Sequence, residues 1–208
     1  MSNIIFSIGH SILSLESFVA LLKQQRISAV CDVRSQPYSR VNPHFSREMI
    51  QLELKRQGLV YVFLGNELGA RSNEPSLLVN GKVSYDRLAD SDCFKRGLQE
   101  VQNLSLNNRV AMMCAEREPL ACHRTILLSR YLRTNGYQVE HILGAGTLET
   151  HDDTMKRLLR TLGLSESDMF KSHEEILAEA YTIQGKRIAY DPMKQVNQRS
   201  AEENAKVR

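Results

Sequence analysis

The chain has 208 residues and a mass of 23.7 kDa, enough for one domain with a small C-terminal extension. Hydrophobic residues make up 42% of it and charged residues 25%, which excludes a wholly disordered protein. The formal net charge of +3 is too small to indicate nucleic-acid binding by itself. No apolar stretch approaches the roughly 20 residues of a membrane span, and the first residues lack the pattern of a signal peptide. We therefore expect a cytoplasmic protein whose four cysteines are free thiols.

Five short apolar runs predict strands, at residues 4–8, 29–33, 59–64, 110–114 and 137–143. Between them lie segments with helical spacing, three of which begin at the capping residues Ser14, Ser46 and Ser91. A further helix is predicted over residues 123–134. Strands that alternate with helices over short connections predict an α/β fold, a single three-layer domain with a mostly parallel sheet of about five strands.

The pattern changes after Gly146, where no strand of comparable strength follows. Residues 152–162 and 166–184 have helical spacing, and residues 195–208 are polar and charged without periodicity. We therefore expect an α/β domain over residues 1–146, C-terminal helices packed on it over residues 147–194, and a flexible tail over residues 195–208.

Titratable and hydrogen-bonding side chains gather where the predicted strands end. In an open parallel sheet, ligands bind outside these carboxyl ends. The candidates are His10 and Ser11 after the first strand, Asp32, Arg34, Ser35, Tyr38 and Arg40 after the second, Glu67 after the third, and Cys114, Glu116, Cys122, His123 and Arg124 after the fourth. The sequence therefore predicts one crevice that these residues share.

The segment from Cys114 to Arg124 carries the strongest signal for chemistry. Cys122 stands where a helix is predicted to begin, and the free N–H groups of a helix start favour a thiolate. Cys122 or Cys114 is therefore the candidate nucleophile, beside His123 as a proton donor or acceptor. The alternative is structural: Cys114 is then a small buried strand residue, and Cys122 only helps to begin the helix.

The other candidates divide between proton transfer and substrate binding. His10, with Asp32 or Glu116, is the candidate for proton transfer. Arg34, Arg40 and Arg124 are the candidates for anion binding. Further substrate contacts are expected from Ser11, Ser35, Tyr38 and Glu67. Two of these assignments have a structural alternative of similar weight. Asp32 and Arg34 also fit an ion pair that shapes the loop, and Glu67 also fits an ordinary loop acid.

A divalent metal is an open alternative at the same place. Cys114, Cys122 and His123, with His10 or Asp32, could supply four ligands of a zinc-like site. The cysteine spacing is not that of a C-x₂-C knuckle, and the neighbouring arginines would repel a cation. The sequence therefore predicts no cofactor, and a divalent metal is the alternative.

Four motifs in order resemble the family called domain of unknown function 488 (DUF488). They are Ser7-Ile-Gly-His-Ser11, Asp32-Val-Arg-Ser-Gln-Pro37 with Ser39-Arg40, Leu64-Gly-Asn-Glu-Leu-Gly69, and Met113-Cys-Ala-Glu116 with Pro119 and Cys122-His-Arg124. The resemblance implies a single cytoplasmic α/β domain with these residues in one pocket, and it implies no reaction. A weaker likeness, to rhodanese-type domains, rests on Cys31-Asp-Val-Arg34, but the loop from Cys114 to Arg124 is longer than a rhodanese loop.

We therefore expect an enzyme, a cysteine-dependent transferase or hydrolase, that acts on a small anionic substrate containing a nucleotide, a phosphate or sulfur. A nucleic-acid or nucleotide binding module without catalysis is one alternative, supported by arginine-lined loops with Tyr38 and Phe45 beside them. A metal-binding Cys/His site in the same pocket is the other. We expect no membrane partner, and the sequence does not indicate an oligomeric state.

Overall fold

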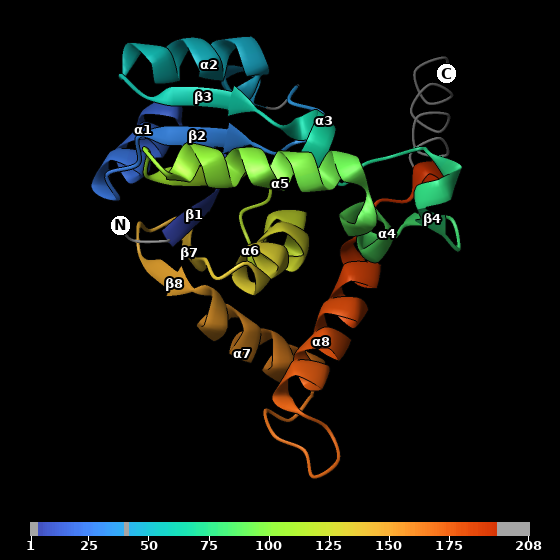
Figure 1. Cartoon of the computed structure of the whole chain (residues 1–208). Coiled ribbons are helices and arrows are strands. Elements are labelled where there is room, and N and C mark those ends of the chain that lie inside the picture. The colour runs from blue at the N-terminus through green and yellow to red at the C-terminus, as the bar shows by residue number, and fades with distance from the viewer. Residues whose placement is uncertain (1–3, 40–41, 195–208) are drawn as a thin grey trace, which may run out of the picture.

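The centre of the computed structural model, which describes residues 4–39 and 42–194, is a six-stranded sheet (Figure 1). Its strands lie in the order β3-β2-β6-β1-β7-β8. They are β1 (Ile4–Gly9), β2 (Ala29–Asp32), β3 (Val60–Phe63), β6 (Val110–Cys114), β7 (Gln138–Ile142) and β8 (Leu148–Thr150). Every neighbouring pair is parallel except β7 and β8. The prediction of an α/β fold with a mostly parallel sheet is confirmed.

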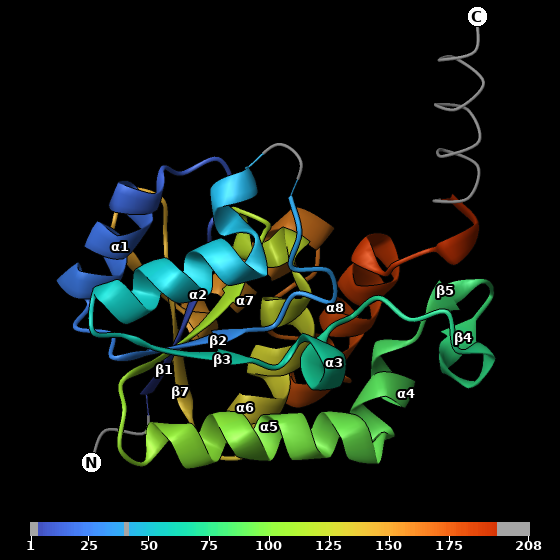
Figure 2. The same ribbon diagram turned by 90° about the horizontal axis from the view of Figure 1, so that it is seen from above.

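Helices cover both faces of the sheet, as the view from above shows (Figure 2). On one face lie α1 (Leu15–Gln24) and α2 (Arg47–Arg56), and on the other lie α5 (Asp92–Ser105) and α6 (Arg130–Thr134). Successive strand residues point to opposite faces. Ile8 and Met113 therefore pack in the core beneath α1 and α2, whereas Met112 and Cys114 pack in the core on the α5 and α6 side.

The remaining elements are η1 (Pro43–Phe45), α3 (Gly65–Leu68), η2 (Pro75–Leu77), β4 (Leu78–Val79), β5 (Lys82–Val83), α4 (Tyr85–Asp90), η3 (Pro119–Ala121), the π-helix η4 (Arg124–Ser129), α7 (His151–Leu162) and α8 (His173–Ile188). Strands β4 and β5 pair as a separate antiparallel hairpin. Among the described residues, none of the helices has both the length and the apolar character needed to cross a bilayer.

Several elements and boundaries differ from those predicted. A sixth strand, β8, pairs antiparallel with β7. The helix predicted over residues 123–134 starts as the π-helix η4 and continues as α6. The last helix begins at His173, because Ser172 and Glu175 form a capping box that ends the preceding loop. The tail predicted over residues 195–208 lies outside the described residues.

Candidate functional site

The candidate site lies at the carboxyl ends of β1 and β6, which are adjacent parallel strands. After β1 the chain enters α1 on one face of the sheet, and after β6 it enters η4 and α6 on the other. Connections that leave neighbouring strands toward opposite faces open a crevice at the strand ends, where ligands of parallel sheets bind.

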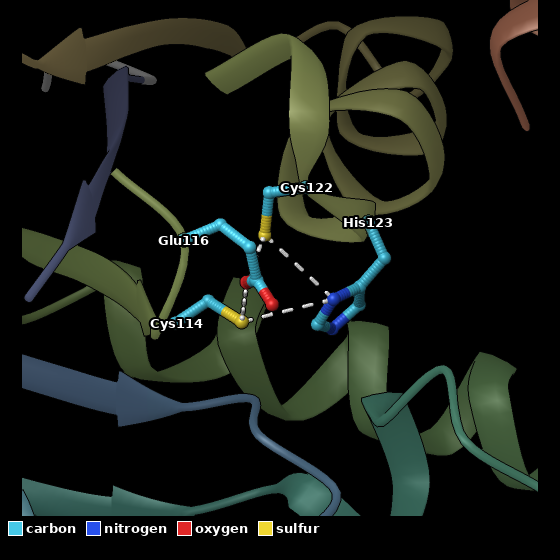
Figure 3. Close-up of side chains that lie close together, drawn as sticks. All are labelled: Cys114, Glu116, Cys122 and His123. Carbon is cyan, nitrogen blue, oxygen red and sulfur yellow. Dashed lines mark hydrogen bonds between the residues drawn. The ribbon is translucent and has the colours of Figure 1, made fainter. Parts of the chain in front are cut away.

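Four side chains converge in this crevice: Cys114, Glu116, Cys122 and His123 (Figure 3). Their four donor atoms all lie within 4.8 Å of one another. The sulfurs of Cys114 and Cys122 lie 2.9 and 3.0 Å from Glu116 Oε2, and each lies 3.8 Å from Nδ1 of His123. Within residues 4–39 and 42–194, these four form a group that could hold a metal ion.

The loop that carries Glu116 is fixed from two sides. A side-chain Cβ at Gly9 would overlap the Glu116 carbonyl oxygen, so only glycine allows the loop to lie this close to β1. From the other side, the fully buried Arg124 donates from Nη1 to Glu116 O at 2.6 Å and from Nη2 to Arg117 O at 3.3 Å. These contacts hold the Glu116 carboxylate next to both sulfurs.

One hydrogen bond determines which nitrogen of His123 faces the two sulfurs. His123 Nε2 lies 3.0 Å from the carbonyl oxygen of Val33, which can only accept, so Nε2 carries the proton. Nδ1 then turns toward Cys114 and Cys122. An imidazole oriented in this way by a backbone carbonyl is the arrangement that histidine ligands of metals adopt.

Burial and mutual charge shift the pKa values of the cluster in different directions. Burial raises the pKa of Cys122, but a hydrogen bond from Cys114 and the charges of Arg124 and His123 outweigh it and leave the pKa well below its usual value. The pKa of Cys114 is raised by that same hydrogen bond and by burial. Burial, followed by the Cys122 charge, also raises the pKa of Glu116. The cluster therefore favours a thiolate on Cys122 and a protonated thiol on Cys114.

A pocket of about 180 Å³ opens onto this cluster. Cys114, Glu116 and His123 form part of its wall, while Cys122 lies behind them. The other side of the pocket is formed by Arg34, Ser35, Arg71, Tyr85 and Tyr190. The pocket therefore combines thiol, carboxylate and imidazole groups with the guanidinium of Arg71.

A second polar group lies on the α1 and α2 side of the sheet. Arg34 donates from Nε and Nη2 to the two carboxylate oxygens of Asp32, at 2.8 and 2.6 Å, and Tyr61 donates to the same carboxylate at 2.8 Å. Arg34 Nη1 donates to Phe45 O at 2.8 Å and lies 3.2 Å from His10 Nε2. Burial, followed by the charge of Arg34, lowers the pKa of His10 to about 4, so this imidazole is neutral and stacks on Phe45.

Comparison with protein families gives one match. The sequence profile described as "Domain of unknown function DUF488" matches residues 14–131. The chain belongs to the DUF488 family. The match contains the whole Cys114–His123 cluster, and the motif from Ser7 to Ser11 precedes it. No curated protein and no solved structure matches this DUF488 chain.

The predicted crevice of the DUF488 domain divides into two groups. Arg34 and Cys114 line the same pocket, but His10 belongs to the group on the opposite side of the sheet. Strand alternation explains the division, because His10 continues the face of Ile8, and Cys114 continues the face of Met112. Both nitrogens of His10 are also engaged, Nδ1 with Ser11 O and Nε2 with Arg34, so the fourth donor beside the two cysteines and His123 is Glu116.

Several other predicted residues lie away from the pocket of the DUF488 domain. Tyr38 is 68% exposed and contacts Glu48, and Glu67 lies against Gly97 of α5, where the missing side chain lets α3 approach. Ser11 contributes its carbonyl to His10, and Arg124 fixes the Glu116 loop. Ser35 lines the pocket as predicted, whereas Arg40 lies outside the described residues.

Sequence reasoning missed several pocket residues, among them Arg71, Tyr85 and Tyr190. Arg71 follows directly on the Leu64-to-Gly69 motif, which was a usable signal. Tyr85 begins α4 in a segment that reads as a loop, and Tyr190 follows the last helix. Nothing in the sequence around these two tyrosines points to the strand ends.

Proposed function

We propose that this DUF488 protein binds a divalent metal ion through Cys114, Cys122 and His123 and uses it to hydrolyse a small anionic substrate. The observation that carries the proposal is the convergence of these three donor atoms beside the Glu116 carboxylate. Two thiolates and an imidazole form a donor set that suits zinc. Catalytic zinc sites commonly have three protein ligands and leave the fourth position for water or substrate.

The distances between the donor atoms indicate that Glu116 lies beside the metal and does not bind it as a fourth ligand. Around tetrahedral zinc, with Zn–S near 2.3 Å and Zn–N near 2.0 Å, ligand atoms lie roughly 3.5 Å apart. The sulfur–Nδ1 distances of 3.8 Å are close to this value. The distances from the sulfurs to Glu116 Oε2, 2.9 and 3.0 Å, are those of hydrogen bonds. Glu116 is thus placed to accept and return a proton.

The charges of the cluster balance with a dication present. Two thiolates neutralise a divalent ion, and the guanidinium of Arg124, which lowers the pKa of Cys122, offsets the carboxylate of Glu116. Arginine near a metal site is therefore no obstacle here, since the guanidinium of Arg34 is already paired with Asp32. A bound zinc ion would make water nucleophilic near neutral pH.

The size and lining of the pocket limit the substrate. A volume of about 180 Å³ admits a phosphate or carboxylate group with a short substituent. Arg71 attracts an anionic group, and Glu116 lines the same pocket. A small phosphate or carboxylate ester fits this arrangement. We also propose a cytoplasmic location, because both metal-binding thiols must stay reduced, and the four cysteines are unpaired.

Metal analysis of untagged protein tests the binding step. We expect about one zinc ion per chain in the wild type and in Cys93→Ala, whose thiol lies outside the cluster, and far less in Cys122→Ser. Hydrolysis of small phosphate and carboxylate esters should depend on the metal and fall in Glu116→Gln, which retains the metal. A wild-type protein that neither contains nor takes up zinc would contradict the proposal.

A metal-free cysteine enzyme is the second candidate, and the contact of both sulfurs with His123 favours it. Cys114, which lines the pocket, would then react with the substrate, and Cys122 behind it would act as its partner. The two candidates differ in one result. Full activity after complete removal of metal, combined with inactivation by thiol alkylation, would support the cysteine enzyme. Nucleic-acid binding remains a prediction from the sequence.

A further inference from the structure

A chain of buried hydrogen bonds runs from the candidate site toward the C-terminal helices. Ser7 Oγ lies 2.6 Å from His141 Nδ1, His141 Nε2 lies 3.1 Å from His151 Nδ1, and His151 Nε2 lies 2.7 Å from the hydroxyl of Tyr181. All four residues are buried. At the other end, Arg124 Nε donates to Ser7 Oγ at 3.3 Å.

The buried hydroxyl proton of Ser7, whose acceptor among the described residues is His141, sets the direction of the later bonds. Arg124 can only donate, so Ser7 Oγ accepts, and the buried Ser7 hydroxyl proton has His141 Nδ1 as its acceptor. His141 is neutral, because burial and then the neighbouring His151 lower its pKa well below the usual value. His141 Nε2 therefore donates to His151 Nδ1, and His151 Nε2 donates to the hydroxyl oxygen of Tyr181.

With the hydrogen bonds oriented in this way, one donor at the end of the chain has no acceptor among the described residues. Tyr181 accepts from His151, so its own hydroxyl proton is free, and no acceptor for it lies within the described part of the chain. The side chain is only 8% exposed. Because Tyr181 lines a pocket, a ligand atom that accepts this proton would be stabilised there.

Tyr181 and His151 both line a second pocket, with a volume of about 500 Å³. It lies between α6, α7 and α8, which supply its lining residues; α7 and α8 form a V beneath α6 in Figure 1. The volume is in the range of ordinary small-molecule sites. This pocket shares no lining residue with the one at the Cys114–His123 cluster.

The lining of this second pocket has an apolar part and a charged part. Met155, Leu159 and Leu177 provide the apolar part. Arg130 lies over the Tyr181 ring, 5.0 Å from its centroid, and Lys156 also reaches the pocket. Each cationic side chain of the lining pairs with a carboxylate: Arg130 with Asp86, Arg133 with Asp152, and Lys156 with Asp153.

We propose that this second pocket binds a small apolar molecule with a carboxylate group. The carboxylate accepts the free hydroxyl proton of Tyr181 and lies near Arg130, and the hydrocarbon part packs on Met155 and Leu177. A carboxylate accepts the unused hydroxyl proton of Tyr181, whereas an ammonium group can only donate and does not match it. The site does not depend on the metal centre proposed above.

Octanoate, octylammonium and octanol are the probes, and titration calorimetry with the full-length protein measures their affinities. We expect octanoate to bind most tightly and octylammonium not at all. Tyr181→Phe should weaken octanoate binding by about tenfold or more, since it removes one hydrogen bond to a charged group. Tyr131→Phe, which changes a tyrosine outside this pocket, should bind octanoate as the wild type does.

Methyl NMR of the wild-type protein locates the site even if Tyr181→Phe fails to fold. Octanoate should shift the resonance of Met155 and leave that of Met112, in the core of the sheet, unchanged. Equal binding of octanoate and octylammonium, unchanged affinity in a folded Tyr181→Phe, or the absence of a Met155 shift would each overturn the proposal. Binding that survives removal of all metal would show that it stands apart from the proposed hydrolase.

Discussion

Substitution of Asp32 by asparagine should destabilise the protein strongly, because Asp32 compensates a buried charge. Its carboxylate accepts from the backbone N–H, Nε and Nη2 of Arg34 and from the hydroxyl of Tyr61. Asp32 is fully buried, and Arg34 is 5% exposed. In Asp32→Asn one oxygen becomes an amide group that points its own protons at donors, and the guanidinium loses its counter-charge.

Loss of one partner from a buried ion pair lowers the free energy of unfolding by about 3–5 kcal/mol. With a urea dependence of about 2–3 kcal/mol per M, the midpoint of unfolding should fall by roughly 1–2.5 M. The matched control is Asp86→Asn, which removes a pair with Arg130 at 3.4 Å whose aspartate is 68% exposed. Its effect should stay within about 0.5 kcal/mol.

Urea unfolding followed by circular dichroism compares the two variants with the wild type. The reasoning would be refuted if Asp32→Asn lost less than about 1 kcal/mol, or if Asp86→Asn lost as much as Asp32→Asn. Either result would mean that burial does not determine the contribution of these pairs.

Three further predictions concern the same end of the sheet. Gly9→Ala should lower the free energy of unfolding by about 1–3 kcal/mol, because the added Cβ displaces the Glu116 carbonyl; unchanged stability and metal content would contradict this. The pKa of His10 falls from 6.5 to about 4 on folding. When the pH is lowered, His10 of the unfolded chain is therefore protonated at a higher pH than His10 of the folded protein. Stability should be full above pH 6.5 and decrease by about 3 kcal/mol as the pH falls toward 4, whereas a flat profile in urea unfolding would count against it. Chelation of the proposed metal should lower the melting temperature of the wild type and leave that of Cys122→Ser unchanged.

The sheet could be predicted because its strands are short apolar runs between capped helices. Val110–Cys114 is buried on both faces, and such continuous runs are typical of central parallel strands. Strand β8 could not be recognised in this way, since Leu148–Thr150 has three residues and only one of them is apolar. The start of α8 was within reach, because Ser172 and Glu175 have the spacing of a capping box.

The candidate site was predictable in its residues and not in its arrangement. Four residues of the site lie together because they belong to one short segment between a strand and the next helix: Cys114, Glu116, Cys122 and His123. The separation of His10 from them depends on which face each strand end presents, and this requires the register of β1 against β6. The pairing of Ile8 with Met113 fixes that register.

The central claim is that both cysteine sulfurs bind one metal ion, and the absorption spectrum of the cobalt-substituted protein tests it most directly. Cobalt(II) occupies tetrahedral zinc sites and shows intense thiolate-to-metal charge-transfer bands in the near ultraviolet. We predict such bands for the wild type and for Cys93→Ala, and a marked decrease in Cys114→Ser and in Cys122→Ser. A wild-type protein that gives no thiolate band with cobalt present would contradict the account.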